Sequence, residues 1–569
     1  MSELNSKKNE IKIYTKLEDI YTKLEKVYLN PEEIPEEYKK LGKNNPEEFI
    51  KFSTESQYED LRSKYNFLYK TDPTTIIRVP YTATLFGDTV TQLFSNKVVA
   101  NLSSDLIILF NKNTTNELNI KFFDNIQQIK KTIGELNELN LSNKEEFTFN
   151  DFAIIGYLSA LKQIKSNNNN FGSNVLILLN NSNKEEVDCY LSIFLAMFLC
   201  CFYINDLESI VKKTINKFSL YEMTILTLTE LCEQNKVLKN LIDINYYTPN
   251  IYFKIFLEKN SFGFNQGNLF YQSPVSLNNS PISLLVFDSL SPEPIIYYSS
   301  SKYWNKRKVE VRLAMALMIK RFKENISQED LIKNSSSIDN FLKIFENNYE
   351  IVLKSIEIYL KKDIYRLNEL KTELPVDKLL KDINNYQGAL LTKEFKLYDR
   401  ILFIIKEHQL VSSLYYKMKK GDNVDWKEMI LESAKLLREN YYCYSDEMLK
   451  IEAELKIKMG ESIPIKCISK GWSGKMVIFG TNDEVKKYEN YISKKYEKLV
   501  EGEGLINAWI SDDVKKYCSI SWLEKGISIL DPKYEDFMLE YSKHKNNVDI
   551  NRISNEQLKE IQLKENSDS

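Results

Sequence analysis

The first apolar pattern of the chain is a helical seam near the N-terminus. In the stretch "IYTKLEDIYTKLEKVYL", apolar side chains recur at spacings of four and three residues, at Ile13, Leu17, Ile20, Leu24 and Val27. This spacing places them on one face of a helix, over about two heptads rather than the three or four that indicate a coiled coil. The pattern predicts a helix that docks on its own domain. A helix that contacts a protein partner or a second copy of the chain is the alternative.

Strand and helix patterns then alternate from residue 56 to 280. A helical stretch, "SQYEDLRSKYNFLYK", precedes the β-rich run "TTIIRVP". Three further strand patterns, "KVVANL", "DLIILFN" and "ELNIKFF", are rich in branched and aromatic residues. Helices are expected at 126–140 and 149–165, a buried strand at 174–179, and an apolar helix at 189–204. These patterns predict a first lobe of mixed α/β structure.

The apolar helix raises the question of a membrane span. Its sequence, "CYLSIFLAMFLCCFYI", holds 16 residues and follows Asp188 directly. A membrane-spanning helix needs about 20 consecutive apolar residues. We therefore expect a helix buried in a protein core, and no membrane segment.

The second half of the chain is predominantly helical. Long amphipathic patterns cover 304–325, 338–362, 397–420 and 426–442. Pro375 and Gly388 interrupt the pattern between 360 and 392, which predicts an insertion or a linker. After Gly460 the strands "IKCISK" and "KMVIFG" precede a further helix.

The length of the chain sets its domain organisation. With 569 residues it is too long for one ordinary core. We expect an N-terminal helical extension (1–55), a first lobe (56–280), a second lobe (281–545) and a flexible polar tail (546–569).

Composition and charge exclude some partners. Hydrophobic residues make up 43% of the chain and aromatic residues 12%, which is ample for a packed interior. The formal net charge is only -3, and no basic stripe is present to attract nucleic acid. Nucleic acid is therefore not expected as a partner.

Cysteines and histidines limit the chemistry further. The seven cysteines form no CxxC pair, so a disulfide framework is not expected. The polar start "MSELNSKKNEIK" has no apolar leader. We therefore expect a cytoplasmic location. The two histidines, His408 and His544, are far apart. A histidine metal site or a Ser-His-Asp triad is not expected.

Four stretches, in the same order along the chain, carry a family resemblance. The first of these to stand out is "SKYWNKRKVEVRLAMALM", with Asn305, Arg307, Glu310, Arg312 and Ala314. The next is "LRENYYCYSDEMLKI", with Leu437, Arg438, Glu439, Tyr441 and Glu447. The loop in "SKGWSGKMVIFG" contributes Gly471, Trp472 and Gly474, and "RVPYTATLFGD" contributes Pro80, Leu85 and Gly87.

These stretches resemble motifs of the galactokinase family in the GHMP kinase superfamily. The resemblance implies a two-lobed GHMP kinase fold, with an N-terminal α/β lobe, a C-terminal ferredoxin-like α+β lobe and helical insertions. It also implies a cleft between the lobes for a sugar and Mg-ATP.

The resemblance places neutral residues where the family has its catalytic groups. Thr82 stands at the position of the family's catalytic Arg, and Tyr271, in "FNQGNLFYQ", at that of its catalytic Asp. A phenol with a pKa near ~10 is a poor base at neutral pH. Asp88 is the sugar-binding candidate, at the position of a family Glu.

The phosphate-binding positions also differ from the family pattern. The turn "LLNNSNKEEV" has no glycine, and Ser182 and Glu185 have the spacing of a capping box that would satisfy the helix end internally. Phosphate-loop candidates are Ser182, Lys184, Gly471, Ser473 and Gly474.

The sequence therefore predicts a galactokinase-like pseudokinase, inactive or strongly impaired, that acts by binding a ligand or a partner. The first alternative is an active, divergent ATP-dependent sugar 1-kinase that uses Asp88 or Glu258. The second is a structural or interaction subunit that uses the N-terminal seam and the inserted helices.

Overall fold

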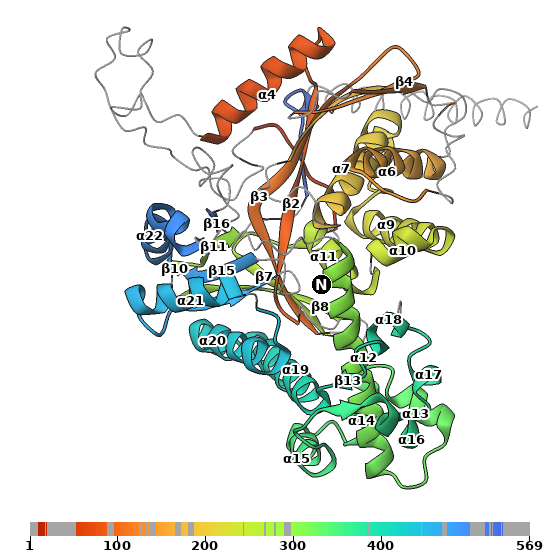
Figure 1. Ribbon diagram of the computed structural model, residues 1–569. Coiled ribbons are helices and arrows are strands. Elements are labelled where there is room, and N and C mark those ends of the chain that lie inside the picture. Colours follow the sequence, from red (N-terminus) through yellow and green to blue (C-terminus); the bar gives the residue numbers. More distant parts are fainter. Residues whose placement is uncertain are drawn as a thin grey trace, which may run out of the picture.

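Two large β-sheets, two small two-stranded sheets and the helices form the part of the chain that the computed structural model describes (Figure 1). Apart from a few single residues, that part comprises 9–16, 53–87, 96–123, 128–132, 144–164, 172–179, 187–242, 244–266, 269–277, 280–288, 297–383, 386–444, 446–468, 475–500, 518–522 and 527–535.

The first sheet has nine strands and mixed strand directions. Its main order is β1 (Ile13–Tyr14), β17 (Ser528–Leu530), β2 (Thr75–Phe86), β3 (Lys97–Lys112), β6 (Ser173–Leu179), β4 (Glu117–Phe122) and β5 (Gln128–Thr132). On a side branch, β7 (Ser261–Gln266) pairs with β3, and β8 (Leu269–Pro274) pairs with β7. The β1–β17 and β4–β6 pairs are parallel. The expected mixed α/β lobe is confirmed.

Side-chain alternation along β3 divides the core of this sheet between its two faces. Ile107 and Leu109 face the helix α4 (Ser53–Tyr69), whereas Leu106, Ile108 and Phe110 face the helices of the opposite layer. That layer contains α6 (Phe149–Gln163), α7 (Val187–Asn205), α8 (Leu207–Val211), α9 (Lys217–Gln234), α10 (Lys236–Leu241) and α11 (Ile244–Phe256). A strand buried on both faces explains why "DLIILFN" is continuously apolar.

The apolar helix α7 is the centre of this layer. It has 19 residues and a mean hydropathy of 2.1 in its most apolar stretch, enough to span a membrane by length and composition, but 94% of that stretch is buried in the protein. It packs closely on α6, because a β-carbon on Gly156 would lie only 2.5 Å from the carbonyl oxygen of Phe194. The expected core helix is confirmed.

The second sheet has four antiparallel strands in the order β14, β15, β11, β16. Along the chain, β11 (Ser283–Asp288) is followed by a helical region, then β14 (Ile465–Cys467), β15 (Lys475–Gly480), α22 (Asn482–Val500) and β16 (Cys518–Trp522). This is the strand order of a ferredoxin-like βαββαβ unit in which the first crossover is enlarged. The expected second lobe is confirmed.

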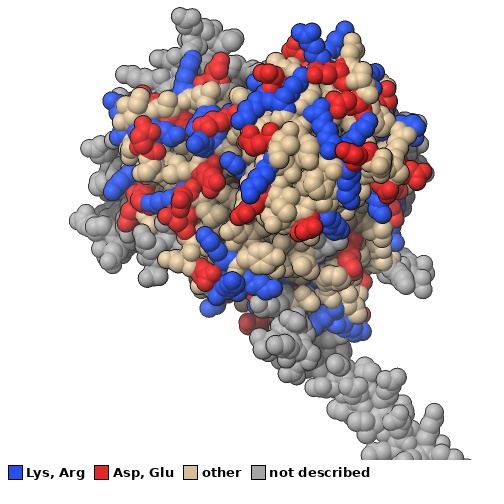
Figure 2. All heavy atoms as spheres, turned by 90° about the horizontal axis from the view of Figure 1, so that it is seen from below, with Lys and Arg blue, Asp and Glu red and all other residues tan. Residues whose placement is uncertain are grey.

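The enlarged crossover holds the helical region. It consists of α12 (Tyr297–Phe322), α13 (Gln328–Asn334), α14 (Ile338–Ile344), α15 (Tyr349–Tyr359), α16 (Leu367–Glu373), α17 (Val376–Leu379), α18 (Tyr386–Leu390), α19 (Leu397–Lys420), α20 (Trp426–Leu436), the π-helix η2 (Leu437–Tyr441) and α21 (Asp446–Met459). Two short antiparallel pairs accompany them, the hairpin of β9 (Ser276–Leu277) with β10 (Ser280–Pro281) and the pair of β12 (Tyr365–Arg366) with β13 (Glu394–Phe395), between which α16 to α18 lie. On the molecular face in Figure 2, acidic and basic side chains intermingle without a field of one sign.

Two sequence predictions of helix were wrong where the chain forms strands. Ile13, expected in the N-terminal seam, lies in β1, and residues 128–132 form β5 inside the expected helix 126–140. The segment at Ile13 pairs with β17, and residues 128–132 pair with β4. This pairing determines the strand conformation of both segments, and it cannot be recognised from the local spacing of apolar residues. The other apolar positions of the seam, Leu17, Ile20, Leu24 and Val27, lie outside the described residues, as does the tail.

The residues that carry the resemblance in α12 and η2 contact one another. Arg307 donates to the carboxylate of Glu310 at 2.8 Å and to the carbonyl oxygen of Tyr441 at 3.0 Å. Arg400 of α19 donates to the same carboxylate at 2.8 Å, and all three charged side chains are at most 9% exposed. Burial alone would raise the pKa of Glu310, but Arg400 and Arg307 outweigh it and hold the pKa below its usual value. The shared motif is therefore a buried structural cluster.

Replacing Glu310 should destabilise the second lobe strongly. Glu310→Gln leaves Arg307 and Arg400 buried without a counter-charge, so we expect a loss of about 3–5 kcal/mol in the free energy of unfolding, measured in urea. Because the folded-state pKa is lowered, this stabilisation is present above the ordinary carboxylate pKa and is lost as pH falls through the lowered one.

The matched control is Glu208→Gln, which removes an exposed carboxylate that pairs with Lys212 on the surface. It should change stability by about 1 kcal/mol or less. Equal losses in the two variants would contradict a structural role for the cluster.

Candidate functional site

The stretch that resembles the kinase signature lies in β2, at an irregularity of the sheet. The register between β2 and β3 shifts between Pro80 and Thr82, where a β-bulge interrupts the ladder. Bulges re-aim side chains and are common beside functional sites. Thr82 is half-buried there, between fully buried neighbours.

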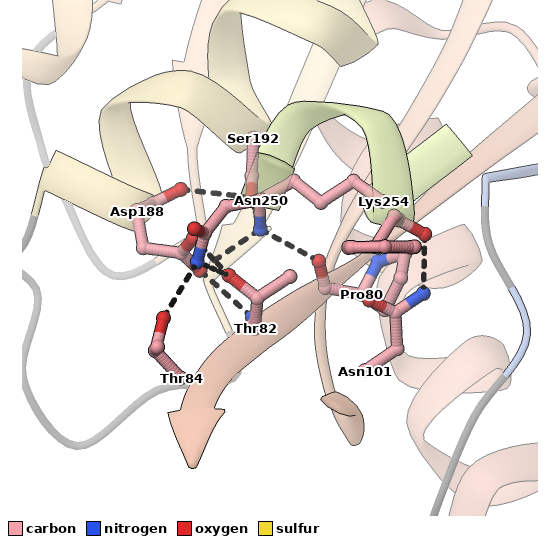
Figure 3. A network of polar contacts seen from close by, with 9 residues as sticks. Pro80, Thr82, Thr84, Asn101, Asp188, Ser192, Asn250 and Lys254 are labelled. Carbon is pink, nitrogen blue, oxygen red and sulfur yellow. Dashed lines mark hydrogen bonds and ion pairs between the residues drawn. The ribbon is translucent and has the colours of Figure 1, made fainter. Parts of the chain in front are cut away.

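Asp188, in the first turn of α7, is the main partner of Thr82. Its carboxylate accepts hydrogen bonds from the Thr82 amide at 3.0 Å and from the Thr82 hydroxyl at 2.6 Å. A carboxylate at a helix N-terminus also interacts favourably with the helix dipole. Figure 3 shows the two side chains directed toward each other.

Lys254, in the last turn of α11, compensates the charge of Asp188. Its ammonium group donates to Asp188 at 2.8 Å, to the carbonyl oxygen of Pro80 at 2.8 Å and to the hydroxyl of Ser192 at 2.9 Å. The side chain of Lys254 is completely buried. Since an ammonium has three donors, every donor has a protein acceptor.

Asn250, one turn earlier in α11, completes the network. Its amide group donates to the hydroxyls of Thr82 at 2.9 Å and Thr84 at 3.3 Å (Figure 3). The amide of Asn101 donates to the carbonyl oxygen of Phe253 at 2.9 Å. The side-chain oxygens of both asparagines are buried and have no hydrogen-bond partner within the described residues. The site therefore holds two acceptors that a donor could satisfy.

A second buried network joins the end of β2 to the second lobe. The amide of Gly87 donates to Glu407 of α19 at 3.2 Å, and the ammonium of Lys466 in β14 donates to the carbonyl oxygen of Leu85. Ser433 accepts from Lys466 at 2.6 Å and donates to Glu407 at 2.8 Å. Gly87 has φ 74°, a conformation that favours glycine. The Leu85 and Gly87 of the signature thus connect the two lobes.

The two expected catalytic positions have different neighbours. Tyr271 lies in β8 opposite Phe264, with its ring 5.7 Å from that of Tyr415, whereas Thr82 contacts Asp188 and Asn250. The alternative acid, Glu258, is exposed just after α11. The other expected site residues, Asp88, Ser182, Lys184, Gly471, Ser473 and Gly474, lie outside the described residues.

Sequence reasoning did not identify Asp188, Asn250 and Lys254 as site residues. A signal for two of them is present, because Asp188 opens a strongly apolar helix and Lys254 interrupts the apolar run "NIYFKIF". Charges in such surroundings are seldom fully buried unless they are paired. The pairing itself depends on tertiary structure.

Within the described part of the chain, His, Cys, Asp and Glu side chains form no cluster suited to a metal ion.

The fold is similar to those of solved GHMP kinases. Galactokinase from Lactococcus lactis, complexed with galactose, matches with a TM-score of 0.51 and 13% sequence identity over 83% of this chain and 99% of that one. Mevalonate kinase from Methanococcus jannaschii matches with a TM-score of 0.40 and 10% identity over 79% of this chain and 98% of its own. The sequence matches no protein-family model and no curated protein. The likeness thus shows the GHMP kinase fold.

Removing the hydroxyl of Thr82 should destabilise the network. Thr82→Val deprives Asp188 of a donor and Asn250 of an acceptor, and an unsatisfied buried polar group costs about 1–3 kcal/mol. We expect a loss of that size in the free energy of unfolding. Thr82→Ser keeps the hydroxyl and should lose no more than about 0.8 kcal/mol, the contribution of one buried methylene-sized group. A Val variant as stable as the Ser variant would show that these bonds do not support the fold.

Proposed function

We propose that the protein is a non-catalytic, galactokinase-like member of the GHMP kinase fold that acts by binding a ligand, rather than by transferring a phosphoryl group. The observation that carries this proposal is the closed network of Asp188 and Lys254 around Thr82. The resemblance places a catalytic cation at the position of Thr82, and a neutral hydroxyl cannot take over that role.

Phosphoryl transfer depends on positioned charges more than on covalent chemistry. A cation must stabilise the transferring phosphoryl group, and a base or orienting group must act on the attacking hydroxyl. Lys254 shares the carboxylate of Asp188 with Thr82, but its three donors bind protein oxygens and its side chain is fully buried. It is therefore used by the fold and not presented to a phosphate.

Asp188 is engaged in the same way. Its two carboxylate oxygens accept three hydrogen bonds, two from Thr82 and one from Lys254. A general base must reach the proton that it removes, within about 2.6–3.2 Å. Acting as a base would require Asp188 to give up bonds that hold β2 to α7.

Ligand binding has separate support. The buried side-chain oxygens of Asn101 and Asn250 accept no hydrogen bond within the described residues, and a sugar hydroxyl that reached them on opening of the site would supply the missing donor. The galactokinase of similar fold was solved with galactose. We therefore propose a sugar as the ligand, with Mg-ATP as a second ligand only if the protein is an active sugar 1-kinase. A role as a structural subunit is the remaining alternative.

The proposal predicts no sugar-dependent turnover of ATP. Purified protein with Mg-ATP and galactose, N-acetylgalactosamine or related sugars should release no more ADP than Asp188→Asn does under the same conditions. ADP release that depends on sugar, is lost in Asp188→Asn and persists in Glu208→Gln would contradict it and support an active kinase.

Ligand binding is tested in the same preparation by thermal unfolding. A sugar present at 100 times its Kd should add about 2.7 kcal/mol to the stability of the folded state. A rise in Tm with a sugar supports the binding role. Unchanged Tm values across the sugar panel would contradict it and favour the structural subunit.

A further inference from the structure

We propose that Cys443 and Cys467 form a reversible disulfide under oxidising conditions. Their sulfur atoms lie 3.6 Å apart, and both residues are buried. Cys443 lies two residues beyond η2, and Cys467 is the last residue of β14. The sequence did not suggest this pair, because the two cysteines are distant along the chain and belong to no CxxC motif.

The contacts of these two cysteines distinguish them from other thiols of the chain. The six cysteines whose side chains are described are all free and buried. The sulfur of Cys232 lies 4.0 Å from the carbonyl oxygen of Ile242, and that of Cys201 accepts from the side chain of Asn205. Cys443 also lies 3.8 Å from the carbonyl oxygen of Leu437, but its sulfur has that of Cys467 as a close neighbour, so oxidation can join the two within one folded molecule.

The backbone beside Cys443 has an uncommon conformation. Tyr442 has φ 55°, in the left-handed region, and it follows a π-helical turn. Both features are rare for residues with a side chain and often mark places where a fold is adapted to function. The sulfurs must approach by roughly 1.5 Å to reach bonding distance. A turn of this kind is a suitable place for that adjustment.

Hydrogen peroxide is an oxidant small enough to test this step. One thiolate attacks the peroxide O–O bond and becomes a sulfenic acid, and the departing hydroxide takes up a proton as water. The second thiolate then attacks the sulfenic sulfur, the S–S bond forms, and the sulfenic oxygen leaves as a second water. Two thiols are thereby oxidised and one peroxide is reduced by two electrons.

The pKa of the Cys467 thiol influences the rate of this step. Burial raises the pKa of Cys467 well above its usual value, the adjacent Cys443 thiol raises it further, and Lys466 opposes the shift. Because the thiolate is the reactive form, oxidation should be slow at neutral pH and faster as pH rises.

The crosslink would connect the buried cluster of Arg307 and Glu310 to the network of Glu407 and Lys466 between the lobes. Lys466, which binds Leu85 and Glu407, immediately precedes Cys467. Tyr441, whose carbonyl oxygen binds Arg307, lies two residues before Cys443. A bond between the two sulfurs therefore joins the buried cluster around Arg307 to the contact that Lys466 makes between the lobes. It also closes a chain loop, which stabilises a folded protein mainly by restricting its unfolded state.

The test is peptide mapping of the full-length protein after treatment with hydrogen peroxide. Remaining thiols are alkylated under denaturing conditions, and the digest is analysed by mass spectrometry before and after reduction. We expect one crosslinked peptide pair containing Cys443 and Cys467, the loss of two alkylatable thiols, and a Tm raised by a few degrees that returns to its starting value with dithiothreitol.

Two variants make the result specific. Cys443→Ser should abolish both the crosslinked pair and the rise in Tm, whereas Cys232→Ser should retain both. Oxidised wild-type protein in which Cys443 and Cys467 remain alkylatable, or are found only as sulfinic or sulfonic acids, would overturn the proposal. A crosslink between other cysteines in their place would overturn it as well.

Discussion

The burial of Lys254 against Asp188 is the constraint on which the candidate site depends. A charge removed from water destabilises the folded state strongly unless an opposite charge and further hydrogen bonds compensate it. Here the compensation comes from three elements, since β2 supplies Thr82 and Pro80, α7 supplies Asp188 and Ser192, and α11 supplies Lys254. The network therefore fixes these three elements relative to one another.

The residues that resemble a kinase family have structural contacts in this fold. Arg307 and Glu310 form a buried cluster with Arg400, and Gly87 contacts Glu407 of the other lobe. None of these contacts requires a substrate. A chain can therefore keep these residues, and with them the two-lobed architecture, even where the resemblance implies that Thr82 replaces the catalytic cation. The proposed non-catalytic role therefore rests on a physical distinction between residues that maintain the fold and residues that would carry out the reaction.

The sequence predicted most of the architecture and little of the site. Long periodic segments such as α7 and α19 were placed well, because an apolar face or a continuous apolar run is a local property. The strand at Ile13 was missed because its partner, β17, lies near the other end of the chain. The Asp188–Lys254 pair was missed for the same reason, since each charge is recognisable locally but the pairing arises only from tertiary packing. Tyr271 was selected from a loose motif match, and its neighbours in the structure are aromatic.

The central claim is that Asp188 and Lys254 form a structural pair, and a double-mutant cycle on the free energy of unfolding tests it most directly. Lys254→Met and Asp188→Leu should each lose about 3–5 kcal/mol, because each leaves one buried charge uncompensated. The double variant should lose at least about 2 kcal/mol less than the sum of the two single losses. Single losses that add to within about 0.5 kcal/mol would show two independent side chains and contradict the account.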